Sequence, residues 1–160
     1  GINNLRGFHA EKLLGETLVP VCSPELLEKV NVIKKIDDLA HHTLLVDEVQ
    51  DVGGEPPSWS YWAESLGVDL PLPKSTRKFG QSNMVIQAAV DDYGVALGRE
   101  PLVADAIQNG QLCVPLSAPV PSQYSYWFVC RKSALKSSRV QAFRGWLKKE
   151  AERFSLKSIY

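Results

Sequence analysis

The chain has 160 residues, of which 44% are hydrophobic and 22% are charged, and 18 basic residues balance 18 acidic ones for a net charge of zero. This composition is typical of a globular chain of one domain or two small lobes. With a net charge of zero and no basic stripe in the sequence, we do not expect this chain to bind nucleic acid. No apolar run approaches the roughly 20 residues of a membrane helix, and the first residues do not have the basic-then-apolar order of a signal peptide, so we expect a cytoplasmic protein without a membrane contact.

Short extended runs alternate with helical segments along most of the chain. Pro20 lies in the first run, and because proline cannot donate to a ladder it is expected at an edge or a junction rather than in a sheet centre. Ser23 and Pro24 then predict the start of a helix, as N-cap and first helical residue. The alternation favours βαβ units and a largely parallel sheet. The runs expected as strands are 17–22, 43–46, 75–79, 95–97, 112–116 and 124–130.

Residues 58–67 carry the strongest helix signal. Apolar residues recur at helical spacing between a capping Ser58 and a closing Gly67. Two tryptophans of this stripe could stack on a ligand, but a Trp pair at this spacing is more typical of a core. The apolar residues of this stripe are Trp59, Trp62, Ala63 and Leu66.

Other elements are expected elsewhere in the chain. A shorter helical turn is expected over 36–40, a loop over 48–57, and a helix from Glu100 to Gly110.

The stretch 79–98 predicts strand, turn, helix, turn and strand within twenty residues. Ser82 or Asn83 is expected to cap the helix, and Gly94 to end it in a left-handed conformation. Residues 84–90 are apolar on almost every face, which indicates a buried helix. The turn therefore places the start of this helix, with its unpaired N–H groups and partial positive charge, at the C-terminal edge of the sheet, where an anion or a dipole can bind.

Motifs for bond-making chemistry are not found. Gly80, Gln81 and Ser82 partly resemble a nucleophile elbow, but Met84 stands where that motif needs a glycine. Adjacent carboxylates diverge at a helix end, so a solvated pair is expected at positions 91 and 92. We therefore expect no catalytic residue, metal or cofactor. The histidines, expected at the surface, are His9, His41 and His42, and the cysteines, expected as buried reduced thiols, are Cys22, Cys113 and Cys130.

The proline-rich segment 117–122 is the clearest linker. An aromatic strand over 124–130 and a long amphipathic helix over 140–151 follow it. One strand and one helix are too little for a domain, so we expect them to belong to a second lobe whose other strands are absent from this chain.

Several segments together resemble a known family. In order, they are Glu11–Leu14, Val19–Pro24, Asp38–Leu45, Phe79 with Ser82, Met84–Val85 and Gln87–Ala89, Gly94–Leu97 and Ala142–Leu147. They are similar to the effector-binding domain of LysR-type transcriptional regulators, closest to the glycine-cleavage activator subgroup, and β-lactamase regulators share much of the pattern. The resemblance covers nearly the whole chain, but the winged helix-turn-helix, the linker helix and the first half of lobe one are missing.

The resemblance implies an α/β, type II periplasmic-binding-protein-like fold with two lobes and mostly parallel sheets, lobe one being incomplete. Residues 1–16 would be the tail end of lobe one and a crossover, 17–118 lobe two, and 119–160 the return strand and C-terminal helix of lobe one. A small-molecule effector would bind between the lobes and control a DNA-bound homodimer or tetramer, with subunits pairing through helices such as 23–30. DNA would be bound only by the missing N-terminal domain.

On this view the helix start in 79–98 is the effector site. A small carboxylate or similarly polar metabolite is expected to bind the N–H groups near Ser82, Asn83 and Met84 and the Ser82 hydroxyl. Alternatively, Ser82 only caps its helix. Other classes left open are a transport solute-binding protein of the same fold and, more remotely, a hydrolase that uses Ser82. The full set of expected effector residues is Pro20, Phe79, Gly80, Gln81, Ser82, Asn83 and Met84.

Overall fold

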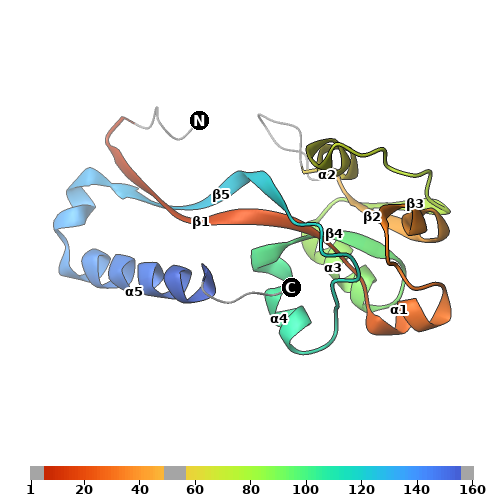
Figure 1. Ribbon diagram of the computed structural model, residues 1–160. Helices are drawn as coiled ribbons and strands as arrows, with labels where there is room; N and C mark the ends of the chain where they lie inside the picture. Colours follow the sequence, from red (N-terminus) through yellow and green to blue (C-terminus); the bar gives the residue numbers. More distant parts are fainter. Residues whose placement is uncertain (1–5, 49–56, 156–160) are drawn as a thin grey trace. The chain divides into compact units, whose positions relative to one another are not determined.

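The computed structural model describes residues 6–48 and 57–155, so most of the loop expected over 48–57 lies outside the described residues. The chain divides into two compact units. One contains the described residues up to Glu16 and those from Gln123 onward, and the other contains Thr17–Ser122. Two long strands, β1 (Phe8–Val21) and β5 (Val120–Arg131), have residues in both units (Figure 1).

The sheet has five strands in the order β3-β2-β4-β1-β5. In the second unit, β2 (Thr43–Asp47) pairs in parallel with β3 (Ser75–Phe79) on one side and with β4 (Val95–Arg99) on the other. β1 is antiparallel to β4, with Leu18 opposite Arg99 and Val21 opposite Ala96. The α/β class with a mostly parallel arrangement of β2, β3 and β4 is therefore confirmed.

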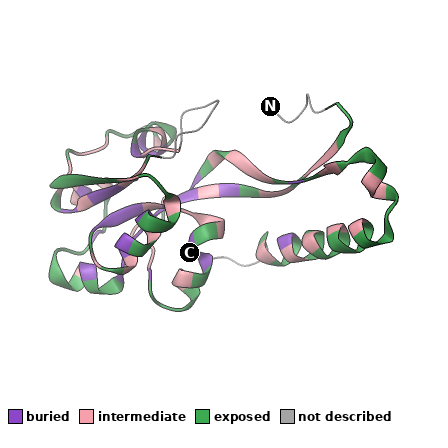
Figure 2. Cartoon of the chain, turned by 180° about the vertical axis from the view of Figure 1, so that it is seen from behind, coloured by how far each residue is buried: buried purple, intermediate pink, exposed green. Residues whose placement is uncertain are grey.

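Neighbouring residues of the central strands point to opposite faces of this sheet and build two cores. Leu18, Leu44 and Val95 pack on one face with the tryptophans of α2 (Trp59–Leu66). Their neighbours Val19, Leu45 and Ala96 pack on the other face with α3 (Ser82–Val90) and α4 (Glu100–Gln108). Buried residues accordingly concentrate along the central strands (Figure 2). A strand covered on both faces reads as a continuous apolar run, as β1 does near its end.

Local signals correctly predicted the starts of α1 and α2 and the end of α2. The Ser23 side chain caps α1 (Pro24–Lys29) by accepting from the Leu26 N–H, and the Ser58 side chain caps α2 by accepting from the Tyr61 N–H, each at 3.1 Å. Gly67 ends α2 with a φ of 69°. The turn expected over 36–40 is a 3₁₀ helix, η2 (Ile36–His41). Both tryptophans of α2 are core residues, as expected, and Trp62 is fully buried with its indole N–H donating to the Ala118 carbonyl at 2.8 Å.

Other expectations about the elements were wrong. Residues 112–116 form no strand and contribute only a single bridge, between Cys22 and Cys113. β1 lies between β4 and β5, so Pro20 is not at an edge of the sheet, but it is the penultimate residue of β1 and therefore fits the other alternative, a junction. The apolar residues of 84–90 do not bury the whole helix, because Met84 is 51% exposed.

The end of α3 also differs from the expectation. The residue in the left-handed region is Asp92, with a φ of 64°, and not Gly94. Gly94 is needed for a different reason, since its φ of 159° is combined with a very close approach to Thr43. A short polar residue such as aspartate is a known alternative to glycine in the left-handed region.

The first unit consists of the outer halves of β1 and β5, a 3₁₀ helix η3 (Lys132–Lys136) and α5 (Ser138–Ser155). Glu11 of β1 accepts a hydrogen bond from Arg144 at 2.6 Å and pairs with Lys148 at 2.5 Å. These two cations, Arg144 foremost, lower the pKa of Glu11 to about 2. Phe143 and Trp146 stack on each other while remaining 54% and 55% exposed. Of the helices in the described ranges 6–48 and 57–155, none is both long and apolar enough to cross a membrane.

Candidate functional site

Three strands of the second unit end side by side. Because β2, β3 and β4 are parallel, their last residues, Asp47, Phe79 and Arg99, reach the same edge of the sheet. Asp47 is paired directly with Phe79, and the next N–H, of Glu48, donates to the Phe79 carbonyl at 2.8 Å. The carboxyl edge of parallel strands is where α/β sheets bind ligands.

The start of α3 lies at this edge. Gln81 is the N-cap, and its carbonyl accepts from the N–H groups of Met84 at 3.1 Å and Val85 at 3.3 Å. Ser82 is therefore the first helical residue, and the expectation that Ser82 or Asn83 caps the helix was wrong. With no cap to form, the Ser82 hydroxyl is directed elsewhere and donates to Asp47 Oδ2 at 2.5 Å.

Ser82 also lies near a cation. Arg99 Nη1 is 3.5 Å from Ser82 Oγ, so the hydroxyl is flanked by the Asp47 carboxylate and the Arg99 guanidinium. We call Asp47, Ser82 and Arg99 the polar cluster. It unites two strand ends and a helix start that are 35 and 17 residues apart in sequence. A hydroxyl between opposite charges can donate to one partner and accept from another, which is useful for orienting a polar ligand.

Sequence reasoning found Ser82 but missed Asp47 and Arg99. The signal that was available is their position, since each is a charged residue at the carboxyl end of an apolar strand of a parallel sheet. The expected site had instead relied on the helix N-terminus for positive charge. In the structure a guanidinium lies beside Ser82, and the nearest carboxylate, Asp47, is already hydrogen-bonded to the start of the helix.

The other expected site residues fall into three groups, of which Phe79 and Met84 form the last. Gly80, Gln81 and Asn83 are exposed around the helix start. No atom lies within 4 Å of where a β-carbon on Gly80 would stand, so the main chain at Gly80 makes no close approach within the protein. Pro20 is buried and lies opposite Leu97 in the register.

Phe79 and Met84 line a groove of about 450 Å³ between β3 and α3. At one end of it the guanidinium of Arg77 lies 5.1 Å from the centre of the Tyr93 ring, a cation–π contact. The groove is thus mixed in character, with an exposed methionine and two aromatic rings beside a cation. The residues lining it are Arg77, Phe79, Met84, Gln87, Ala88, Asp91 and Tyr93.

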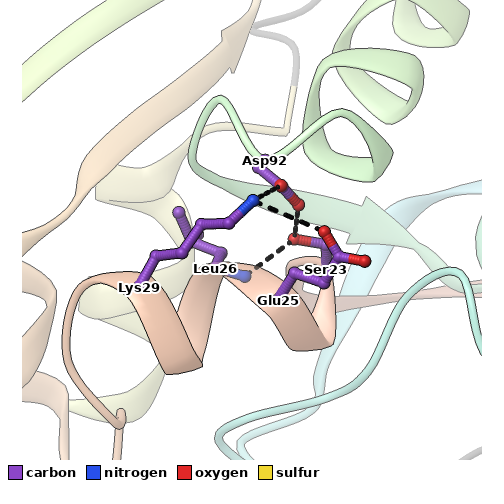
Figure 3. A network of polar contacts seen from close by, with 5 residues as sticks. All are labelled: Ser23, Glu25, Leu26, Lys29 and Asp92. Atoms are coloured by element: carbon purple, nitrogen blue, oxygen red, sulfur yellow. Dashed lines mark hydrogen bonds and ion pairs between the residues drawn. The ribbon is translucent and has the colours of Figure 1, made fainter.

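Asp92, expected to be solvated, belongs to a structural network instead (Figure 3). It accepts from the Ser23 hydroxyl at 2.5 Å and from Lys29 Nζ at 2.6 Å. Lys29 first, and Ser23 second, lower the pKa of Asp92. The same Ser23 oxygen caps α1, so one network joins the start and end of α1 to the turn after α3. Asp91 only exchanges a hydrogen bond with Gln87 of its own helix.

The histidine expectation was wrong for one residue. His42 is 2% exposed, and burial lowers its pKa, an effect that the Asn31 main chain offsets only in part. His41 is exposed, as expected.

Across residues 6–48 and 57–155, no three His, Cys, Asp or Glu side chains lie close enough together to hold a metal ion. The polar cluster at the carboxyl ends of the parallel strands is the candidate site.

The α/β sheet with parallel β2, β3 and β4 belongs to the type II periplasmic-binding-protein-like fold class, as the family match and two similar solved structures show. The effector domain of the transcriptional regulator AmpR of Pseudomonas aeruginosa has this fold and superposes with a TM-score of 0.71 at 28% identity, over 95% of this chain and 71% of that one. The AmpR effector-binding domain from Citrobacter freundii gives a TM-score of 0.70 at 21% identity, over 92% of this chain and 70% of that one.

Residues 1–152 match the model of the LysR substrate binding domain, and the chain belongs to that family. It is similar to the glycine cleavage system transcriptional activator of Escherichia coli strain K12, with 34% identity over 147 residues, which is 92% of this chain and 46% of that protein. It is also 29% identical to the regulator DsdC of the same organism, over 88% of this chain and 45% of that protein. The chain thus spans about half the length of the curated relatives it matches.

Proposed function

We propose that this chain is the effector-sensing part of a cytoplasmic LysR-type transcriptional regulator and that it catalyses no reaction. The observation that carries the proposal is the polar cluster, in which the Ser82 hydroxyl lies between Asp47 and Arg99 where β2, β4 and α3 meet. This is the edge at which a ligand would be held in an α/β sheet. The names of the relatives, which are transcriptional regulators, support sensing over transport of a solute.

The charges of the cluster indicate the chemistry of the effector. Arg99 offers a planar donor group that suits a carboxylate, and the first N–H groups of α3 have no acceptor one turn earlier in the helix. Asp47 offers an acceptor for an ammonium or hydroxyl group. We therefore propose a small metabolite that carries a carboxylate and a hydrogen-bond donor, held by Ser82 and the exposed residues around it, with Phe79 and Met84 at the border of the site.

The proposed organisation has residues 17–118 as lobe two of the domain, with 1–16 and 119–160 as parts of lobe one. Exposed apolar residues in the first unit, including Phe143 and Trp146, support completion of lobe one by sequence outside this chain. We place DNA binding in a separate domain, since the chain carries no net positive charge to attract a phosphate backbone. The full-length protein would act as a homodimer or tetramer.

The experiment is calorimetric titration of the full-length protein with small carboxylic acids, with and without an α-amino group. Ser82→Ala should weaken binding of the best compound by about 1–2 kcal/mol, because one hydrogen bond within a charged cluster is lost. Arg99→Gln should weaken it further, and should abolish the preference for a carboxylate.

Ser58→Ala is the matched control, since Ser58 is a true N-cap far from the cluster in sequence. It should lower stability by about 1 kcal/mol and leave affinity unchanged. If Ser82→Ala lowers the melting temperature yet leaves affinity intact, Ser82 has only a structural role and the effector binds elsewhere.

A further inference from the structure

Two of the three cysteines lie face to face. Cys22, directly after β1, and Cys113, after α4, form an antiparallel bridge in which each N–H donates to the other carbonyl, at 3.2 and 2.8 Å. The Cys113 thiol donates to the Cys22 carbonyl oxygen at 3.4 Å, so its sulfur lies against the main chain of the residue that carries the other thiol. Their separation of 91 residues means that only the fold brings them together.

The bridge geometry is compatible with a covalent link. In an antiparallel pair that exchanges both hydrogen bonds, the α-carbons are about 5.5 Å apart. Disulfides accept α-carbon separations of roughly 4.4 to 6.8 Å but need β-carbons within about 4.5 Å, so a small main-chain adjustment is required. The main chain at Cys113 can adjust more easily than that of a residue within a strand, because the Cys22–Cys113 bridge is isolated and is not part of a strand ladder.

The two thiols have unequal surroundings. Cys22 is fully buried, whereas Cys113 is only partly buried. Contact with the Cys22 thiol lowers the pKa of Cys113, and the same contact together with burial raises the pKa of Cys22. Cys113 is therefore both the more accessible sulfur and the better source of a thiolate, which is the nucleophilic form.

We propose that Cys22 and Cys113 are a peroxide-sensitive pair that forms a reversible disulfide. The Cys113 thiolate attacks the distal oxygen of a hydroperoxide, giving a sulfenic acid and releasing the alcohol, or water from hydrogen peroxide. The Cys22 sulfur then attacks the Cys113 sulfur, a proton leaves Cys22, and water is expelled. In total, two thiols and one hydroperoxide give one disulfide, one alcohol and one water. The link would tie the end of β1 to the segment that follows α4.

The test treats the native full-length protein with hydrogen peroxide, alkylates the remaining thiols and maps the peptides by mass spectrometry. The expected product is a Cys22–Cys113 cross-linked peptide, two hydrogens lighter than the sum of its parts and restored by dithiothreitol. In Cys22→Ala the reaction should stop at a Cys113 sulfenic acid that dimedone traps. Cys130→Ser, which removes the cysteine of β5, should form the cross-link at the wild-type rate.

Three results would overturn the proposal. The first is native protein in which Cys130 is oxidised while Cys22 and Cys113 remain free. The second is a cross-link that forms only after denaturation. The third is Cys113→Ser protein whose Cys22 reacts with peroxide as fast as in wild type, since burial should protect Cys22. A variant that fails to fold does not affect the wild-type measurement, which decides the question alone.

Discussion

The main chain of Gly94 packs against that of Thr43, so closely that a β-carbon at position 94 would lie 2.3 Å from the Thr43 carbonyl oxygen. These residues directly precede the paired residues Leu44 and Val95, where β2 and β4 begin to run in parallel. Any side chain at position 94 would therefore push apart two central strands. In addition, Gly94 has a φ of 159°, a backbone conformation that residues other than glycine seldom adopt.

Gly94→Ala is expected to destabilise the protein by about 2 kcal/mol or more, because the added carbon meets main-chain atoms that cannot rotate away. Denaturant unfolding gives the free energy. The control is Gly145→Ala in α5, where no atom lies within 4 Å of the new carbon. That change should stabilise by about 0.5–1 kcal/mol, as alanine does in a helix. Equal effects of the two substitutions would contradict the assigned contact.

Asp92 is expected to be more important for stability than its neighbour Asp91. Asp92→Asn keeps a residue that tolerates the left-handed region but loses the charge partner of Lys29, and Asp92→Ala loses both properties. Thermal melts at pH 7 should therefore rank wild type above Asp92→Asn and that above Asp92→Ala, with Asp91→Ala close to wild type.

The pH dependence of the Asp92 effect follows from its lowered pKa. A carboxyl with a depressed pKa in the folded state contributes stability above its ordinary value of 3.8, and loses it as the pH falls through the folded value. The gap between wild type and Asp92→Asn should thus shrink below pH 4. A gap that widens on acidification would show that the network in Figure 3 is not ionic.

His42 is expected to make the protein sensitive to mild acid. Burial lowers its pKa in the folded state, so the unfolded chain takes up the proton first as the pH falls below about 6.5. Stability should be complete above that pH and should decline below it. His42→Gln should flatten the slope of unfolding free energy against pH between 7 and 5, and His41→Gln, at the exposed neighbouring position, is the matched control. Identical slopes in the three proteins would refute the assignment.

Trp62→Phe is expected to cost about 1–3 kcal/mol of unfolding free energy. The substitution leaves a smaller ring in a fully buried site and deprives the Ala118 carbonyl of its 2.8 Å donor. Trp146→Phe on α5 is the matched control, since that ring is 55% exposed, and it should change stability by less than about 0.5 kcal/mol. Chemical denaturation followed by far-ultraviolet circular dichroism measures both without relying on tryptophan fluorescence.

The sequence alone was sufficient for elements whose signals are local. The limits of α2 follow from a serine that caps its third N–H and a glycine that ends it with a positive φ, both contacts within one turn. The tryptophan stripe was correctly placed in the core because its period matches a helix with one buried face. The family resemblance was also readable, since its segments occur in order along nearly the whole chain and the family match confirms it.

Only the tertiary structure determined which polar groups meet. Ser82 bonds Asp47 instead of capping its helix because the register of β2 brings a carboxylate to the start of α3. Asp92 is ordered by Ser23, 69 residues away. Cys22 faces Cys113 across a bridge that no local pattern foretold. Helix and strand signals act over a few neighbouring residues, whereas the pairing of side chains depends on strand order and register, which arise only when the whole sheet assembles.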